Sequence, residues 1–186
     1  MQGKDAMKRI CLLFLTLCLL LCGCGKRNDE QRFRAFSAAL AERDTLGFTA
    51  ELCAKYPDKN VRMTLRFSLQ GELQRVTVLK PDIIAGIGAA VRAGETQLEY
   101  DDVILDTGPL DAYGLSPLSA LPILVDALRG GFPASCWEED GLTVMSLIRD
   151  DRYTVEVWFD ADMTPLHAEL LSAGAVTVVC DINDWS

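Results

Sequence analysis

The stretch Val61-Arg62-Met63-Thr64-Leu65-Arg66-Phe67-Ser68-Leu69 decides the fold, because apolar and polar side chains alternate along it without a break. Successive side chains of a β-strand point to opposite faces, so this period of two indicates a strand with one buried and one solvated face. Residues 48–56 alternate in the same way, and Gln70-Gly71 predicts a turn into a third strand that ends before Pro81. We expect these three strands to form an antiparallel meander.

The last third of the chain predicts a second meander. Its strands are expected near 133–138, 142–149, 152–159, 166–172 and 175–182. The turns between them are rich in Asp and Gly, which favour tight turns: Asp140-Gly141, Asp150-Asp151, the Asp160–Pro165 segment and Ala173-Gly174.

Two helical segments accompany the strands. Residues 29–43 place Phe33, Phe36 and Leu40 on one helical face, with Asn28 or Asp29 as the cap. Residues 121–129 predict a second helix that follows a bent approach at 116–121, because Pro122 has no amide hydrogen to donate. Gly130-Gly131 ends that helix.

Residues 82–107 are ambiguous between helix and strand. Positions 83–91 fit either periodicity, and two glycines there disfavour a helix. A turn at Gly94-Glu95 and a strand from Leu98 to Leu105 favour a hairpin. The whole pattern predicts an α+β fold: one strongly curved antiparallel sheet, a half-barrel, with helices packed on its concave face. Residues 29–186 are expected to form a single domain.

A set of apolar side chains is expected on the helix-covered face of the sheet: Phe48, Leu52, Met63, Phe67, Tyr153, Val157 and Phe159. The simpler interpretation is a packed hydrophobic core. The alternative is an apolar cavity between sheet and helices that takes an acyl chain or an apolar partner segment. The sequence favours the core and leaves both interpretations open.

The N-terminus has the organisation of a secretory signal peptide. Basic residues precede an apolar run from Ile10 to Leu21, which is shorter than the ~20 residues of a membrane-spanning helix. Leu21-Cys22-Gly23-Cys24 resembles a bacterial lipobox. That resemblance implies cleavage between Gly23 and Cys24, and a diacylglyceryl thioether with acyl chains such as palmitate on Cys24. Residues 1–23 are then the signal peptide, whether it starts at Met1 or Met7, and residues 24–28 a short tether.

Composition excludes several functions. The chain has a net charge of −9, which disfavours nucleic acid and anionic membrane surfaces as partners. Three cysteines remain after Cys24, namely Cys53, Cys136 and Cys180, and one disulfide or three thiols are both compatible with that number. The spacing of these cysteines does not indicate a metal site.

Catalytic motifs are also lacking in the sequence. The chain has one histidine, His167, and no G-x-S-x-G or HExxH motif, so we assign no catalytic residue and no metal site. Acidic pairs lie at Asp101-Asp102, Glu138-Glu139-Asp140, Asp150-Asp151 and Asp160/Asp162. Asp is favoured in turns for its local backbone hydrogen bonds, which is the simpler interpretation of most of these pairs.

Four stretches support a family resemblance: LKPDIIAGI at 79–87, LEYDD at 98–102, GLSPLSALP at 114–122 and FDADMTP at 159–165. Together with the order of helix, meander, helical segment and meander, they resemble the LolA/LolB-type lipoprotein-carrier fold. The pattern is more similar to its Gram-positive branch, the GerS-like germination and sporulation lipoproteins. The resemblance implies that residues 83–91 form a strand.

The family implies two roles. Classical carriers shield lipoprotein acyl chains in a cavity, whereas GerS-like members bind and support a cell-wall amidase. We therefore expect a non-enzymatic binding or scaffolding lipoprotein of the cell envelope, anchored at the outer face of the cytoplasmic membrane, with no cofactor beyond the lipid on Cys24. The alternative is a carrier or chaperone of lipids or lipoprotein acyl chains, and an envelope hydrolase is a weaker one.

Overall fold

The structure is a computed structural model that describes residues 25–92, 95–111 and 114–186. Within these ranges the strands are β1 (Thr45–Lys55), β2 (Asn60–Gln70), β3 (Leu73–Lys80), β4 (Gly88–Arg92), β5 (Glu95–Tyr100), β6 (Val103–Asp106), β7 (Phe132–Glu139), β8 (Leu142–Ile148), β9 (Tyr153–Phe159), β10 (Pro165–Ser172) and β11 (Ala175–Asn183). The helices are α2 (Gly25–Ala41) and α3 (Pro117–Gly130), with a short 3-10 helix, η1 (Asp82–Ile84).

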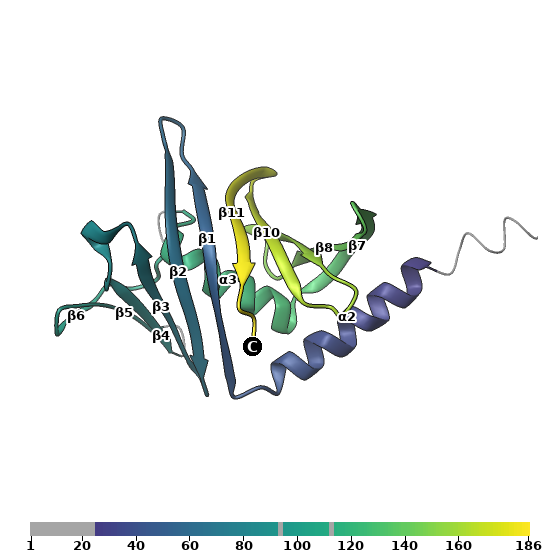
Figure 1. Ribbon diagram of the computed structural model, residues 1–186, viewed down its shortest axis with the longest axis horizontal. Helices are drawn as coiled ribbons and strands as arrows, with labels where there is room; N and C mark the ends of the chain where they lie inside the picture. The colour runs from purple at the N-terminus through teal and green to yellow at the C-terminus, as the bar shows by residue number, and fades with distance from the viewer. Residues whose placement is uncertain (1–24, 93–94, 112–113) are drawn as a thin grey trace, which may run out of the picture.

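All eleven strands form one antiparallel sheet that does not close, in the order β6-β5-β4-β3-β2-β1-β11-β10-β9-β8-β7 (Figure 1). Strands that follow one another in the chain are neighbours in the sheet, except β6 and β7. The first and last strands, β1 and β11, pair at the centre and join the two meanders. The connection from β6 to β7 runs from one edge of the sheet to the other and contains α3.

The first meander confirms the prediction from the alternating stretch. In the register of β1 and β2, Phe48 lies opposite Phe67 and Leu52 opposite Met63, so the apolar set of each strand shares one face. The β2–β3 pair extends that face with Val76 and Val78. Polar residues of these strands face the other side, as a period of two requires.

Residues 82–106 differ in part from the prediction. The hairpin is present as β4 and β5, but residues 82–84 form η1, so only the end of the 83–91 segment is strand. The predicted single strand from Leu98 to Leu105 is wrong. Asp101 and Asp102 both have positive φ, 48° and 63°, and reverse the chain between β5 and β6. Two consecutive positive φ values are typical of a tight hairpin turn.

The second meander is confirmed to within about a residue at most strand ends. Its burial pattern alternates most regularly in β9, where Tyr153, Val155, Val157 and Phe159 face the core. Strand β7 forms the second edge of the sheet, and α2 contacts it.

Helix α2 begins at Gly25, so residues 25–28, which we assigned to the tether, are helical. It also ends at Ala41, two residues before the predicted end. Its apolar face carries Phe33 and Leu40, which are almost completely buried, and Phe36, which packs against the same core.

Helix α3 corrects the expectation of a bent approach. The helix starts at Pro117, four residues earlier than predicted, and Pro122 lies inside it. A capping box explains the early start: the Ser119 amide donates to the Ser116 hydroxyl oxygen, and the Ser119 hydroxyl lies 2.9 Å from the Ser116 amide. Pro117 occupies the first turn, where a missing amide hydrogen costs little. Helix α3 lies behind the central strands in Figure 1 and contacts strands of both meanders.

Candidate functional site

Cys24, the predicted site of lipid attachment, and the Gly23–Cys24 cleavage site lie outside the described residues, and both stay predictions. None of the helices within the described ranges is both long and apolar enough to cross a membrane. The prediction of an anchor therefore depends on the lipobox sequence.

Of the seven apolar side chains predicted to line a cavity, all but Tyr153 belong to, or pack against, one core cluster that includes the helices. Six of them are between 0% and 8% exposed: Phe48, Leu52, Phe67, Tyr153, Val157 and Phe159. Met63 is partly buried and packs against the same cluster. Phe159 is covered by α2, since the Phe33 and Phe36 rings meet its ring edge-on at centroid distances of 6.0 and 5.5 Å. Side chains of α2 and α3 therefore occupy the space next to these residues.

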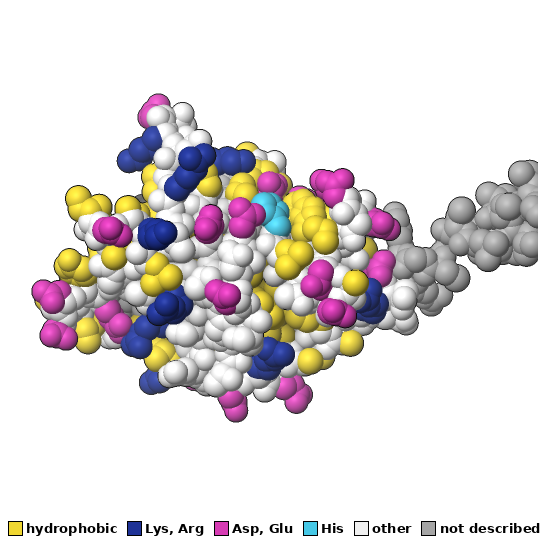
Figure 2. Space-filling model, in the orientation of Figure 1, with side chains coloured by type: hydrophobic (Ala, Val, Ile, Leu, Met, Phe, Trp, Pro, Cys, Tyr) yellow, Lys and Arg dark blue, Asp and Glu magenta, His cyan; other side chains and the backbone are white. Residues whose placement is uncertain are grey.

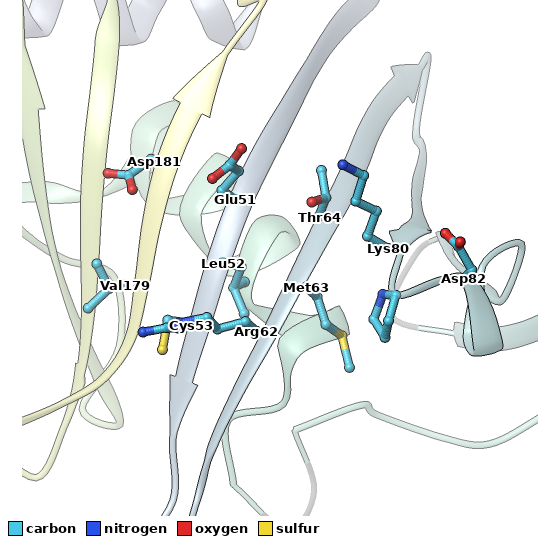
Figure 3. Close-up of a pocket in the computed structure, with 11 residues that line it drawn as sticks. Glu51, Leu52, Cys53, Arg62, Met63, Thr64, Lys80, Asp82, Val179 and Asp181 are labelled. Carbon is cyan, nitrogen blue, oxygen red and sulfur yellow. The ribbon is translucent and has the colours of Figure 1, made fainter.

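A pocket of about 520 Å³ lies at the margin of this core, where β2 extends past the end of β3. Its lining comes from four strands and the turn after β3: Glu51, Leu52, Cys53, Arg62, Met63, Thr64, Lys80, Pro81, Asp82, Val179 and Asp181. Figure 3 shows Arg62 reaching across toward Cys53, and Lys80 extending toward Thr64, its register partner. Only Leu52 and Met63 of the predicted cavity set reach the pocket, and charged groups of both signs surround them.

The sequence analysis did not single out the polar lining of this pocket. Glu51, Arg62 and Asp181 lie on separate strands and are brought together only by the pairing of β1 with β2 and with β11. The sequence signal available was that each of these residues occupies a polar position in the alternating pattern of its strand. Register across the β1–β11 pair is not readable from local patterns, because the two strands lie at opposite ends of the chain.

The acidic pairs are turn residues where the structure gives their geometry. Asp101, Asp102 and Asp140 adopt positive φ. Asp150 Oδ1 accepts hydrogen bonds from the backbone amides of Arg152 and Tyr153 at 2.9 and 3.3 Å. These contacts confirm the turn interpretation for those positions.

The Asp160 carboxylate is predicted to stabilise the turn between β9 and β10. Its Oδ1 accepts from the amides of Asp162 and Thr164 at 2.9 and 2.8 Å, and Arg32 of α2 donates to the Ala161 carbonyl oxygen of the same turn. Asp160→Ala should lower the free energy of unfolding by about 1–2 kcal/mol, since two amide hydrogen bonds lose their acceptor. Urea denaturation measures this, with Asp160→Asn as the control because it keeps an acceptor oxygen. Equal losses in both variants would contradict the prediction.

His167 lies on the face of the sheet that the helices leave uncovered. Its Nδ1 is 2.7 Å from Asp181 Oδ1 and its Nε2 is 4.0 Å from Glu169 Oε1. The Trp158 ring meets the imidazole edge-on at 5.0 Å between centroids. In Figure 2 the cyan side chain of His167 lies between acidic and hydrophobic neighbours. A carboxylate that orients an imidazole is one part of a Ser/Cys-type nucleophilic site, but none of these three neighbours is a Ser, Thr or Cys that the imidazole could activate.

Acidic residues face one another beside His167. Glu156 and Glu169 are direct cross-strand neighbours. Burial raises the pKa of the Glu156 carboxyl, and the negative charges of Glu169 and Glu139 raise that pKa further. Among the residues the structure describes, no cluster of three or more His, Cys, Asp or Glu side chains is arranged to hold a metal ion.

The structure distinguishes between a disulfide and a free thiol at two of the three cysteines. Cys53 and Cys180 are free thiols. Cys180 is completely buried, and burial raises the pKa of its thiol far above the ordinary value. A buried neutral thiol packs as a small apolar side chain, and its reactivity is low.

Comparisons with known proteins are informative about the fold. No family model matches the chain, and no curated protein matches it. Among solved structures, it is similar to a putative outer membrane lipoprotein-sorting protein domain from Vibrio parahaemolyticus, with a TM-score of 0.50, 15% identity, and coverage of 83% of this chain and 90% of that one. It is also similar to a DUF1329 family protein from Desulfovibrio piger, with a TM-score of 0.50, 11% identity, and coverage of 86% and 90%.

A third similar structure is the LolA superfamily protein NE2245 from Nitrosomonas europaea, with a TM-score of 0.49, 12% identity, and coverage of 81% of this chain and 91% of that one. At these identities the likeness concerns the fold. The open antiparallel sheet with two helices is similar in fold to the lipoprotein-sorting protein domain, which agrees with the resemblance to lipoprotein carriers. Assignment to the GerS-like branch stays a prediction.

Proposed function

We propose that the chain is a lipid-anchored protein of the cell envelope that binds a partner protein and performs no catalysis itself. The observation that supports this role best is the packed core. Six of the seven residues predicted to line a carrier cavity belong to, or pack against, a core that contains side chains of α2 and α3, and Phe33 of α2 meets the Phe159 ring directly. Because the interior is filled by side chains, we expect a partner to bind at the surfaces of the sheet.

The anchor and the location are parts of the same proposal. The lipobox ending in Cys24 supports a diacylglyceryl anchor after removal of a signal peptide, and hence a domain held at the outer face of the cytoplasmic membrane. The GerS-like stretches support a role in sporulation or germination, with a cell-wall amidase as one candidate partner.

We infer that the helices cover the concave face of the sheet. Strands β4 and β8 are seven strand spacings apart in the sheet order, or about 34 Å if the sheet were flat. Helix α3 has 14 residues and spans only about 21 Å. Nevertheless α3 contacts both β4 and β8, which supports a sheet that curves toward the helix.

A pull-down of the anchored, full-length protein after crosslinking in its own cells tests the binding role. We expect recovery of a particular envelope protein that does not appear when the same signal and lipobox carry an unrelated domain. That control removes proteins captured through the membrane alone. Recovery of no envelope protein beyond those found with the control would overturn the proposal, and a non-covalently bound lipid in its place would favour the carrier role.

A lipid carrier is the second candidate, and the pocket beside Leu52 and Met63 is the observation in its favour. Its 520 Å³ open at the margin of the core, and an acyl chain would meet these two apolar side chains there. Mass spectrometry of the natively purified protein should then detect a bound acyl ligand in addition to the lipid on Cys24. A binding protein without carrier function shows only the covalent lipid.

A further inference from the structure

Strand β6 is an exposed apolar edge of the sheet. All four of its residues are exposed, and Val103, Ile104 and Leu105 keep 65%, 62% and 60% of their surface accessible. Tyr100 on the neighbouring strand is 53% exposed. Figure 2 shows hydrophobic and acidic side chains together at this end of the molecule, over β5 and β6 of Figure 1. Every other strand of the described sheet has at least one buried residue, so β6 requires a separate explanation.

Within the described residues no strand pairs with the outer side of β6, so the backbone groups that point outward there are open to a further strand. Tyr100 and Val103 are paired across the tight Asp101-Asp102 turn, and the Thr107 amide donates to the Thr96 carbonyl oxygen at 3.2 Å. In an antiparallel ladder hydrogen-bonded pairs alternate with pairs whose amides and carbonyls point away. Ile104 therefore directs its amide and carbonyl to the outer edge, where another strand would bind them.

The opposite edge of the sheet is protected, whereas β6 is not. Strand β7 contains Pro133, has an irregular register between Pro133 and Ser135, and is contacted by α2. Proline, bulges and covering helices are common means of blocking an edge strand. Strand β6 has no proline, shows no register shift in its pairing with β5, and has an apolar sequence. Because β6 lacks the features that block β7, a further strand can pair with it.

Charge determines which strand fits. Acidic side chains lie at both ends of β6: Asp101 and Asp102 in the turn before it, and Asp106 at its end. An antiparallel second copy would place the Asp101-Asp102 turn of one chain near Asp106 of the other, and like charges across strands are destabilising. Arg75 on β3 is paired with Glu99 of β5 at 3.1 Å. The edge is therefore complementary to an apolar segment with basic ends.

We propose that β6 binds an extended segment of a partner protein as an additional antiparallel strand, and that the segment has an apolar centre flanked by Lys or Arg. The partner's backbone pairs with the outward groups of Ile104 and Asp106, and its basic ends meet the acids on either side. This inference rests on the proposed binding role and assigns that role to one surface.

The test uses the detergent-solubilised full chain and a defined peptide, acetyl-Lys-Lys-Thr-Val-Thr-Val-Thr-Lys-Lys-amide with a fluorophore. Anisotropy should show saturable binding, and hydrogen exchange at residues 103–106 should slow when the peptide is added. The matched peptide with Glu in place of each Lys is expected to bind at least about tenfold more weakly, because it places acids against acids.

Variants at the edge separate backbone pairing from other binding. Ile104→Pro removes an amide that β5 does not use and should weaken peptide binding about tenfold, whereas Ile104→Thr keeps the amide and should bind nearly as well. Replacing Asp101, Asp102 and Asp106 by Asn, which tolerates positive φ, should abolish the preference for the basic peptide.

Several results would overturn the proposal. Peptide binding that Ile104→Pro leaves unchanged would exclude pairing at β6. A dimer in sedimentation that Ile104→Pro dissolves would make a second copy the occupant. Slowed exchange at residues 103–106 on adding phosphatidylglycerol vesicles alone would make a membrane the occupant. Each of these results would exclude partner binding at β6 without affecting the envelope pull-down. The two experiments therefore test the β6 proposal and the general binding role separately.

Discussion

Cys24→Ala is expected to abolish incorporation of labelled palmitate into the protein completely. The thiol of Cys24 is the predicted site of the thioether, and alanine has no atom that can form it. Each buried CH₂ of an acyl chain contributes about 0.8 kcal/mol to membrane binding, so two chains make a stable anchor that this variant lacks. Cell fractionation should show that the lipid-anchored form is lost. Any protein that remains in the membrane fraction should have the mass of the uncleaved precursor.

Cys22→Ala is the matched control for this experiment. Cys22 lies two residues away inside the predicted signal peptide, so its replacement should leave palmitate labelling and the mature mass unchanged. Loss of labelling in Cys22→Ala, or retention of it in Cys24→Ala, would show that the lipobox is misassigned. The outcome is independent of which surface of the folded domain binds a partner.

Period-two patterns predicted most of the sheet because one face of each strand is buried. In β2 and β9 every second residue is apolar and faces the core, so the pattern determines both the strand and its orientation. The turns were also predictable, since Asp140-Gly141 and the Asp160 loop contain residues that form local backbone hydrogen bonds.

Where neither face is buried, periodicity does not help. Residues 98–105 carry apolar side chains on both sides of Asp101-Asp102, and the prediction joined them into one strand. The structure reverses the chain at these two residues. Helix α3 starts earlier than predicted for a different reason. The Ser116–Ser119 capping box and Pro117 define its first turn, and Pro122 is accommodated in the second turn without ending the helix.

The site was the least predictable part. All but one of the apolar residues predicted to line a cavity lie in or against one buried cluster, but a core and a cavity need the same residues in the same pattern. What separates the two is the volume that α2 and α3 fill, which depends on how the helices are placed. The β6 edge and the polar lining of the pocket depend on strand order, which involves residues far apart in the sequence.

Phe159→Ala should lower the free energy of unfolding by about 3–5 kcal/mol, because it removes a fully buried ring from a packed core and leaves a void. The Phe33 and Phe36 rings of α2 lose their edge-on partner in the same change. Urea denaturation followed by circular dichroism measures the loss. If the interior were an open lipid cavity, this ring would have fewer packed neighbours and its removal would cost much less.

Phe132→Ala is the matched control, since it makes the same substitution at a ring that is 65% exposed. Its expected effect is within about 0.5 kcal/mol. A loss below about 1 kcal/mol for Phe159→Ala would contradict a packed core, and acyl-chain addition that restored the variant's stability would favour the carrier role. A large loss that lipid does not restore leaves the surfaces of the sheet, with β6 first among them, as the places where this fold can act.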